Sequence, residues 1–192
     1  MVKNTDISDL KVRKVKSQYP ERGIETMFRI TSNNHQRLSD MADNKAHIMI
    51  TANSIIISVM LSILLRKLED NPTFIIPTLI LLAVCVSCMV FSILATRPSI
   101  PKGVFSPQQI ESQEVNLLFF GNFFKMDFET YSKAMQMMMN DRDFLYGNLI
   151  RDIYAQGTVL GKKYKHLRAA YSTFMFGIIA AVIAFLIAAI NA

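Results

Sequence analysis

The chain has 192 residues, of which 51% are hydrophobic and only 19% are charged, with a mean hydropathy of +0.26. This length suits one domain, and the mean composition is close to that of a soluble protein. The charged residues, however, are not distributed as in a soluble protein. Three stretches contain no Asp, Glu, Lys or Arg: Ala46–Leu65, Asn71–Thr96 and Ala169–Ala192. Each stretch is long enough to cross a hydrocarbon core of about 30 Å as a helix. The sequence therefore argues against a soluble globular domain, a disordered chain, a collagen and a disulfide scaffold.

The basic residues predict the topology of these three spans. Residues 1–45 carry nine, and residues 97–168 carry ten, of the 21 lysines and arginines. Three spans place both segments on one side, which the positive-inside rule makes the cytoplasm, with the C-terminus outside. The net charge of +6 is then a topology signal, and we expect no nucleic-acid partner. Residues 1–45 lack an apolar core, so we expect no cleavable signal peptide.

Helical periodicity divides the rest of the chain. From Ile24 to Lys45, one face recurs at steps of three and four, and no Pro or Gly interrupts residues 24–70, which predicts one long helix entering the membrane. The predicted divisions are a tail at 1–20, a cytoplasmic helix at 21–45, a first span at 46–65, an outer loop at 66–71, a second span at 72–96, a cytoplasmic helical module at 97–168 and a third span at 169–190.

The cytoplasmic module contains clear helix starts. Ser106 precedes Pro107 and is followed by Gln109, the pattern of an N-cap with a capping box. Asp127 is predicted to cap a helix ending near Asn140, and a last helix beginning near Asp141 continues into the third span. We therefore predict an all-α membrane protein with three transmembrane helices, two of them continuous with long cytoplasmic helices, plus a small helical cytoplasmic module.

A belt of polar residues precedes the first span. Asn33, Arg37, Asp40 and Asn44 follow each other at steps of four, three and four, so they share one helical face. One interpretation is a solvated face with salt bridges. The other is a site that recognises a polar ligand through amides, a guanidinium and carboxylates.

A second polar feature lies inside the first span. His47, Thr51, Ser54, Ser58 and Ser62 share one face at steps of four, three, four and four. Hydroxyl groups within a bilayer commonly form hydrogen bonds between helices. The alternative is a polar stripe that lines water when subunits rearrange.

The last span and its approach carry two further signals. The third span has small residues at four-residue spacing, which favours close helix packing within or between subunits. These residues are Gly177, Ala180, Ala181, Ala184 and Ala188. Lys162, Lys163, Lys165, His166 and Arg168 precede this span, either as anchors against anionic lipid or as a phosphate clamp.

The sequence does not favour catalysis. It contains no glycine-rich phosphate loop, no HExxH, no GxSxG and only three histidines. Cys85 and Cys88 lie within the second span without a partner ligand nearby, so we interpret them as small apolar helix residues. We expect no enzymatic activity, no metal and no cofactor.

Three segments together resemble a known family. The segments NNHQRLSDMADNKAHIMITANSIIIS (33–58), NLLFFGNFFKM (116–126) and LIRDIYAQGTVLGKKY (149–164) resemble the transmembrane effectors of bacterial Pycsar antiphage systems. This resemblance implies a partner pyrimidine cyclase that makes cyclic CMP or cyclic UMP on infection. It implies an inner-membrane effector that responds by impairing membrane integrity, which ends the infected cell.

The resemblance also implies a helical ligand site, since no cyclic-nucleotide-binding β-roll is visible. Arg37, Lys45 or Arg151 would meet the phosphate, and an asparagine would recognise the base. The candidate ligand-binding residues are Asn33, Asn34, Arg37, Asp40, Asn44, Lys45 and Arg151. Because three spans cannot enclose an aqueous path alone, we expect a homo-oligomer. A membrane-anchored scaffold and a small constitutive channel subunit are the alternatives.

Overall fold

The computed structural model describes residues 21–67, 72–98, 103 and 105–191. The predicted tail at 1–20 and residues 68–71 of the predicted outer loop lie outside the described residues. The helices are α1 (Glu21–Lys67), a 3-10 turn η2 (Pro72–Phe74), α2 (Ile75–Thr96), α3 (Pro107–Glu111), α4 (Phe120–Phe123), α5 (Phe128–Asn140) and α6 (Arg142–Ile190).

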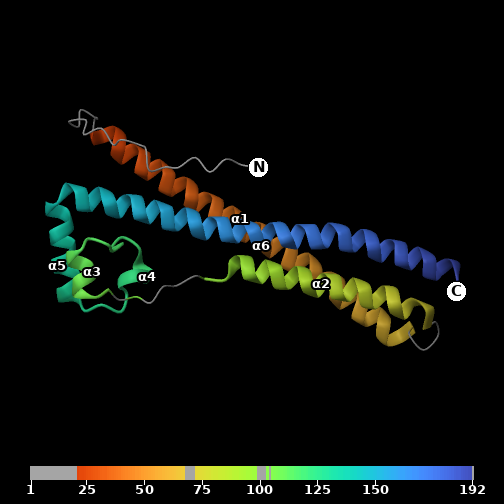
Figure 1. The fold of residues 1–192 in the computed structure, drawn as a ribbon. Coiled ribbons are helices and arrows are strands. Elements are labelled where there is room, and N and C mark those ends of the chain that lie inside the picture. Colours follow the sequence, from red (N-terminus) through yellow and green to blue (C-terminus); the bar gives the residue numbers. More distant parts are fainter. Residues whose placement is uncertain (1–20, 68–71, 99–102, 104, 192) are drawn as a thin grey trace, which may run out of the picture.

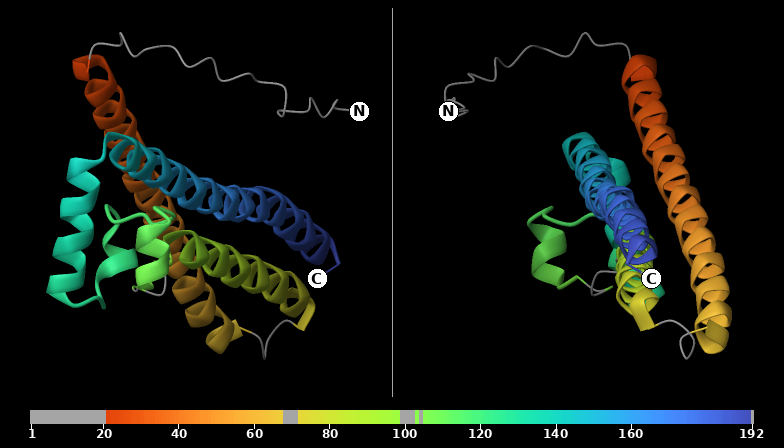
Figure 2. Two further views of the ribbon diagram at one scale, coloured as in Figure 1. Left: turned by 60° about the vertical axis from the view of Figure 1, so that its left-hand side comes forward. Right: turned by 90° about the vertical axis from the view of Figure 1, so that its right-hand side faces the viewer.

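The predicted fold class is confirmed. Three helical segments, Arg22–Ile63, Pro72–Thr96 and Arg142–Ile190, are long and apolar enough to cross a membrane. The described ranges contain no strand. In Figure 1, α2 lies along α6 while α3, α4 and α5 gather beside the first part of α6, and α1 crosses them. The second view of Figure 2 shows α1 along one side of the molecule, with α2 and α6 on the other.

The small residues of α6 pack within the chain. Gly177 lies so close to α2 that a Cβ atom there would be 2.3 Å from a methyl carbon of Val84. Ala181 and Ala188 are buried, whereas Ala180 is exposed. Close approach of this kind needs small side chains, which explains the spacing seen in the sequence. For Gly177, the neighbour is α2 of the same chain.

A buried polar junction joins the three long helices. The amide nitrogen of Asn53 on α1 donates to the carbonyl of Met49 at 2.7 Å and contacts the Sγ of Cys88 on α2 at 3.4 Å. The Cys88 thiol in turn donates to the carbonyl of Ala170 on α6 at 3.4 Å. Cys85 and Cys88 are free and fully buried, and Cys88 differs from the predicted apolar role because its thiol takes part in these polar contacts. Asn53 therefore ties α1 to its neighbours.

The small helical module has its own core, which holds a polar anchor. Leu117, Met138 and Phe144 are among its buried side chains. The amide of Asn148 on α6 is fully buried, accepts from the backbone N–H of Leu117 at 2.9 Å and donates to the carbonyl of Phe144 at 3.1 Å. One side chain thereby fixes the loop before α4 onto the start of α6.

The predicted helix starts are confirmed. Ser106 and Gln109 form the capping box of α3, and Asp127 accepts from the backbone of Thr130 at 2.8 Å at the start of α5. Asp141 accepts from the backbone N–H groups of Asp143 and Phe144 at the start of α6. Backbone N–H donation to these carboxylates lowers the pKa of both Asp127 and Asp141 from the ordinary value.

Candidate functional site

A cavity of about 650 Å³ lies outside the apolar spans, between α1, α6 and the loop that enters α4. This volume is within the range of about 300–1,000 Å³ that is usual for small-molecule sites. The lining residues are Ser32, His35, Gln36, Ser39, Asp40, Leu118, Phe119, Phe120, Asn122, Asp152, Ala155, Gln156, Val159 and Leu160. Two of the three contributing elements, α1 and α6, continue into the membrane spans.

Aromatic rings form one wall of the cavity. Phe119 and Phe120 lie with their ring centroids 5.0 Å apart and their planes inclined at 56°. Their loop is held by Asn116, whose side-chain oxygen accepts from the backbone of Leu118 at 3.1 Å. Asn122 donates to the carbonyl of Asn116 at 3.0 Å. The wall is thus positioned by hydrogen bonds, and it offers flat π surfaces to a ligand.

A chain of polar contacts borders the same cavity. Asp152 on α6 accepts from Asn116 at 3.2 Å and from Gln156 at 2.6 Å. Ser32 on α1 donates to the side-chain oxygen of Gln156 at 3.3 Å. These contacts join α1, α6 and the aromatic loop through side chains that line or border the cavity. A ligand that replaced any one of these hydrogen bonds would affect the positions of all three elements.

His35 is the most unusual polar group of the cavity. Its Nδ1 atom is buried and has no hydrogen-bond partner among the described residues. The histidine lies against Gly157, where a Cβ atom would be 3.5 Å from its Cε1. Buried polar atoms are normally paired with protein, water or ligand, because an unpaired one costs about 1–3 kcal/mol. His35 is therefore a group that a polar ligand would satisfy.

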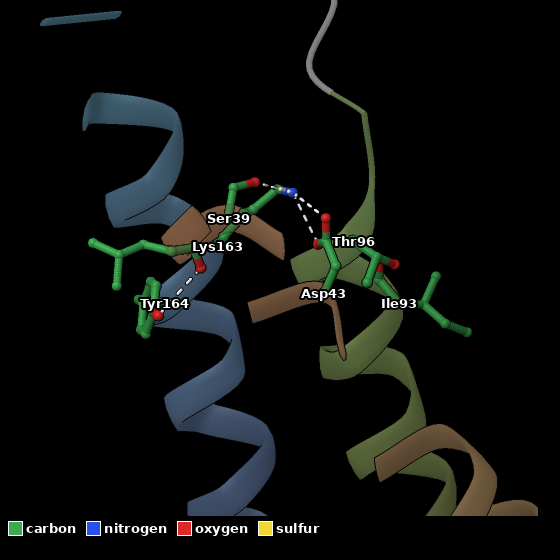
Figure 3. A network of polar contacts seen from close by, with 7 residues as sticks. Ser39, Asp43, Ile93, Thr96, Lys163 and Tyr164 are labelled. Carbon is green, nitrogen blue, oxygen red and sulfur yellow. Dashed lines mark hydrogen bonds and ion pairs between the residues drawn. The ribbon is translucent and has the colours of Figure 1, made fainter. Parts of the chain in front are cut away.

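An ion pair closes the end of the cavity that faces the spans. The Lys163 ammonium on α6 donates to both carboxylate oxygens of Asp43 on α1, at 2.8 Å and 2.7 Å, and to the hydroxyl of Ser39 at 2.9 Å. Figure 3 shows this contact, which we call the clamp, beside Thr96 at the end of α2. The side chains of Lys163 and Asp43 are only 16% and 32% exposed. The clamp uses all three ammonium protons.

The charges of the cavity are unevenly distributed. Its lining includes the carboxylates of Asp40 and Asp152 but no lysine or arginine. The nearest cation that the hydrogen bonds identify is Lys163, because Ser39 both lines the cavity and accepts from its ammonium. The lining therefore favours donor-rich groups beside Asp40 and Asp152, and an anionic group would reach the Lys163 ammonium only by displacing Asp43 or Ser39.

The structure distributes the predicted ligand-binding residues over several places. Asp40 lines the cavity. Asn33, Arg37 and Asn44 are exposed, as is Asn34, so the polar belt points largely away from the cavity. The residues of this face lie in a row along α1 and do not meet at one site.

The remaining two candidates lie elsewhere. Lys45 lines a shallower pocket of about 340 Å³ with Tyr164, Leu167, Arg168 and Tyr171, close to the start of the apolar spans. Arg151 donates to the backbone carbonyls of Gln113 and Val115 and so holds the loop after α3. Arg151 and Asp152, adjacent in sequence, therefore both contact the loop between α3 and α4.

The polar stripe of the first span lies on the outer side of the three-helix packing. His47, Thr51, Ser54, Ser58 and Ser62 are all exposed. The Ser54 hydroxyl donates to the carbonyl of Ile50 at 2.8 Å, within its own helix. The stripe is thus free to contact lipid, water or another subunit.

Phe119, Asp152 and Gln156 line the cavity but were not among the predicted ligand-binding residues. Gln156 is the polar member of a series of apolar residues at steps of three and four, which includes Ile153 and Leu160, and this interruption was the available signal. The described ranges contain no group of three His, Cys, Asp or Glu side chains placed to hold a metal.

Three helical segments that are long and apolar enough to cross a membrane, two of which also border a ligand-sized polar cavity, define a helical membrane protein with a polar module outside its spans. The chain matches the family model for the Pycsar effector protein domain over residues 26–190, and it belongs to this family. It is therefore a membrane protein of antiphage cyclic-nucleotide signalling. Comparisons with curated proteins and with solved structures return no match.

Proposed function

We propose that the protein binds cyclic CMP or cyclic UMP in the cavity between α1, α6 and the aromatic loop. The family supplies the signal class, a cyclic nucleotide from a partner cyclase. The observation that carries the assignment of the site is the cavity itself, with aromatic rings, carboxylate and amide groups and the buried Nδ1 of His35.

The arrangement of the cavity suits a pyrimidine nucleotide in one orientation. The base stacks on Phe119 and directs its N–H donors toward Asp152 and Gln156, since carboxylate and amide oxygens accept such donors. The phosphate lies toward Ser39, where it takes the Lys163 ammonium from Asp43. From Ser32 to Ser39, α1 rises about 10 Å, which is the length scale of one nucleotide.

Binding is tested with purified protein in detergent. Cyclic CMP and cyclic UMP are titrated against the melting temperature and by calorimetry, with cyclic AMP as the comparison. Phe119→Ala and Gln156→Leu are expected to reduce affinity at least tenfold. Phe128→Ala and Gln136→Leu are the matched controls, because both residues are exposed on α5 away from the cavity. Unchanged affinity in both cavity variants would place the site elsewhere.

We propose further that the ligand-bound protein impairs the bacterial inner membrane as a homo-oligomer. The N-terminus and residues 97–168 face the cytoplasm, where the cyclase makes its product, and the C-terminus lies outside. Subunits assemble so that the polar stripe faces the interior of the assembly, because hydroxyls and an imidazole are disfavoured against lipid. Only a ligand with higher affinity for the active arrangement can drive this change.

Membrane impairment is tested by dye release from vesicles that contain the protein. Ser54→Leu with Ser58→Leu is expected to abolish nucleotide-dependent release while leaving insertion intact. Ser87→Leu is the matched control, because Ser87 is also exposed and also donates to its own helix, at 2.7 Å. Full release from the double variant would refute the role of the stripe.

A further inference from the structure

A second pocket, which we call the boundary pocket, lies where α1 and α6 enter the apolar spans. Its volume is about 340 Å³, and its lining residues are Lys45 on α1 with Tyr164, Leu167, Arg168 and Tyr171 on α6. None of these residues lines the larger cavity. The volume is at the lower end of the range of about 300–1,000 Å³ that is usual for small-molecule sites, so the boundary pocket has room for a small polar group.

The basic residues of the boundary pocket lie at the level of the lipid headgroups. Lys45 is the last charged residue before the charge-free segment that begins at Ala46, and Arg168 is the last before the segment that begins at Ala169. Tyr171 follows Arg168 by three residues, and tyrosines are enriched at this level because their rings suit lipid and their hydroxyls suit water. The boundary pocket thus lies where the phosphate groups of a bilayer are found.

Both cations of the boundary pocket are available to a ligand. Lys45 and Arg168 are exposed, and neither forms a hydrogen bond or an ion pair with another described residue. The nearest acidic residue along α1 is Asp43, which is already paired with Lys163. The lining contains no Asp or Glu, whereas the larger cavity is lined by carboxylates and by no lysine or arginine. The boundary pocket is therefore the one of the two that suits an anion.

Packing between the helices fixes the frame of the boundary pocket. Leu167 is 4% exposed and packs in a cluster with three buried alanines of α1 and α2. Tyr164 packs against the same cluster, and its hydroxyl donates to the carbonyl of Leu38 on α1 at 3.3 Å (Figure 3). Because small residues let helices approach closely, cations from α1 and α6 border the same pocket.

We propose that the boundary pocket binds the phosphate group of an anionic phospholipid. The Arg168 guanidinium donates to two phosphate oxygens through its planar fork, and the Lys45 ammonium supplies the second positive charge. The acyl chains extend along the apolar surface of the spans. A cyclic nucleotide also carries a phosphodiester, but the lining offers no amide or carboxylate to recognise a base. Basic pockets between membrane helices are typical sites for anionic headgroups.

This inference goes beyond the proposed nucleotide site and does not depend on it. On the proposed orientation, the lipid belongs to the cytoplasmic leaflet. Lys45 follows Asp43 by two residues, and Arg168 follows Lys163 by five. A bound lipid therefore joins the same two helices as the clamp does, on the side of the clamp that faces the spans.

Native mass spectrometry of the full-length protein in detergent tests the site. Phosphatidylglycerol is the anionic probe, and phosphatidylcholine is the zwitterionic comparison. The parent protein is expected to bind phosphatidylglycerol at least tenfold more tightly. Lys45→Gln and Arg168→Gln are each expected to lower the affinity for phosphatidylglycerol about fivefold, since a basic residue at an anionic surface contributes about this factor. Equal affinity of the parent protein for the two lipids would overturn the proposal.

Matched variants distinguish a defined site from general attraction to basic residues. Lys162→Gln and Lys165→Gln are the controls, because both residues are exposed in the same basic cluster but lie outside the boundary pocket. They are expected to leave the affinity unchanged. Arg168→Lys keeps the charge without the planar fork, so we expect it to lose less affinity than Arg168→Gln. Losses of equal size in the control and pocket variants would refute a defined site.

Cyclic CMP added to the lipid-bound protein distinguishes the two sources of phosphate. We expect phosphatidylglycerol to stay bound at saturating nucleotide, and Lys45→Gln and Arg168→Gln to bind nucleotide as the parent does in calorimetry. Displacement of the lipid by nucleotide, together with weaker nucleotide binding in both variants, would assign the boundary pocket to the nucleotide and overturn the lipid site. A parent protein that binds phosphatidylglycerol but no nucleotide would support the lipid site and refute the proposed function.

Discussion

The clamp between Lys163 and Asp43 offers the sharpest perturbation of the coupling between the cavity and the spans. Lys163→Met removes the ammonium and leaves Asp43 partly buried beside Ser39 without its cation. Removal of one partner costs about 3–5 kcal/mol in a fully buried pair and about 0–1 kcal/mol at a surface. Because Lys163 is 16% and Asp43 is 32% exposed, we expect an intermediate loss of about 2–3 kcal/mol.

A loss of this size is measurable as a melting shift of roughly 4–12 °C for a chain of this length. Lys162→Met is the matched control, because Lys162 is adjacent and exposed. Asp43→Asn and the double variant complete a mutant cycle, in which the coupling energy between the two residues is the quantity of interest. Equal melting of Lys163→Met and Lys162→Met, with zero coupling, would refute the energetic role of the clamp.

The same variants distinguish two roles of the clamp, which are to hold the resting state and to bind the ligand. If the nucleotide phosphate takes Lys163 from Asp43, Asp43→Asn is expected to release dye without nucleotide and to bind nucleotide more tightly. Lys163→Met is also expected to release dye without nucleotide, but its response to added nucleotide is lost. A Lys163→Met protein that is silent alone and fully responsive to nucleotide would contradict this exchange.

Three further perturbations test the packing. Asn148→Leu leaves the buried N–H of Leu117 unpaired, so we expect a stability loss of about 1–3 kcal/mol in thermal melting. Gly177→Ala is expected to separate α2 from α6 and lower the melting temperature, and Val84→Ala in the same chain is expected to restore it, because the clash is with that side chain. The pKa of Asp141 is lowered in the folded protein. Its contribution to the free energy of unfolding is therefore complete above the ordinary pKa and disappears as the pH falls through the lowered value. Asp141→Asn, a cap that does not titrate, is therefore expected to lose less helicity between pH 5 and pH 3, by circular dichroism.

Local signals in the sequence were sufficient for the helices but not for the cavity. Ser106, Asp127 and Asp141 each act on N–H groups within three residues of themselves, so their roles follow from short-range chemistry. Gln156 meets Ser32 across 124 residues of sequence, after the chain has passed through two spans, and no local pattern encodes that contact.

The role of Lys163 in the clamp could not be predicted from the general rule for basic residues beside a span. Lys163 stands in a basic cluster before the third span, and such clusters are normally anchors at the lipid surface. Its partner Asp43 is 120 residues away, so the sequence predicted each charge without the pair. The available signal was its position: Lys163 follows Leu160, which lines the cavity, by three residues and so lies on the same side of α6.

The clamp makes a quantitative case for a switch. Shifting an equilibrium from 1:99 to 99:1 takes about 5.5 kcal/mol of differential ligand affinity. Half of that free energy, about 2.7 kcal/mol, sets the resting population of the active state at 1:99. A clamp of about 2–3 kcal/mol is of this size, so one ion pair is sufficient to hold the resting state. Because α1 is unbroken from Glu21 to Lys67, a change at the clamp is carried along the helix into the first span, and we expect Asp43→Asn to lower the nucleotide concentration needed for dye release.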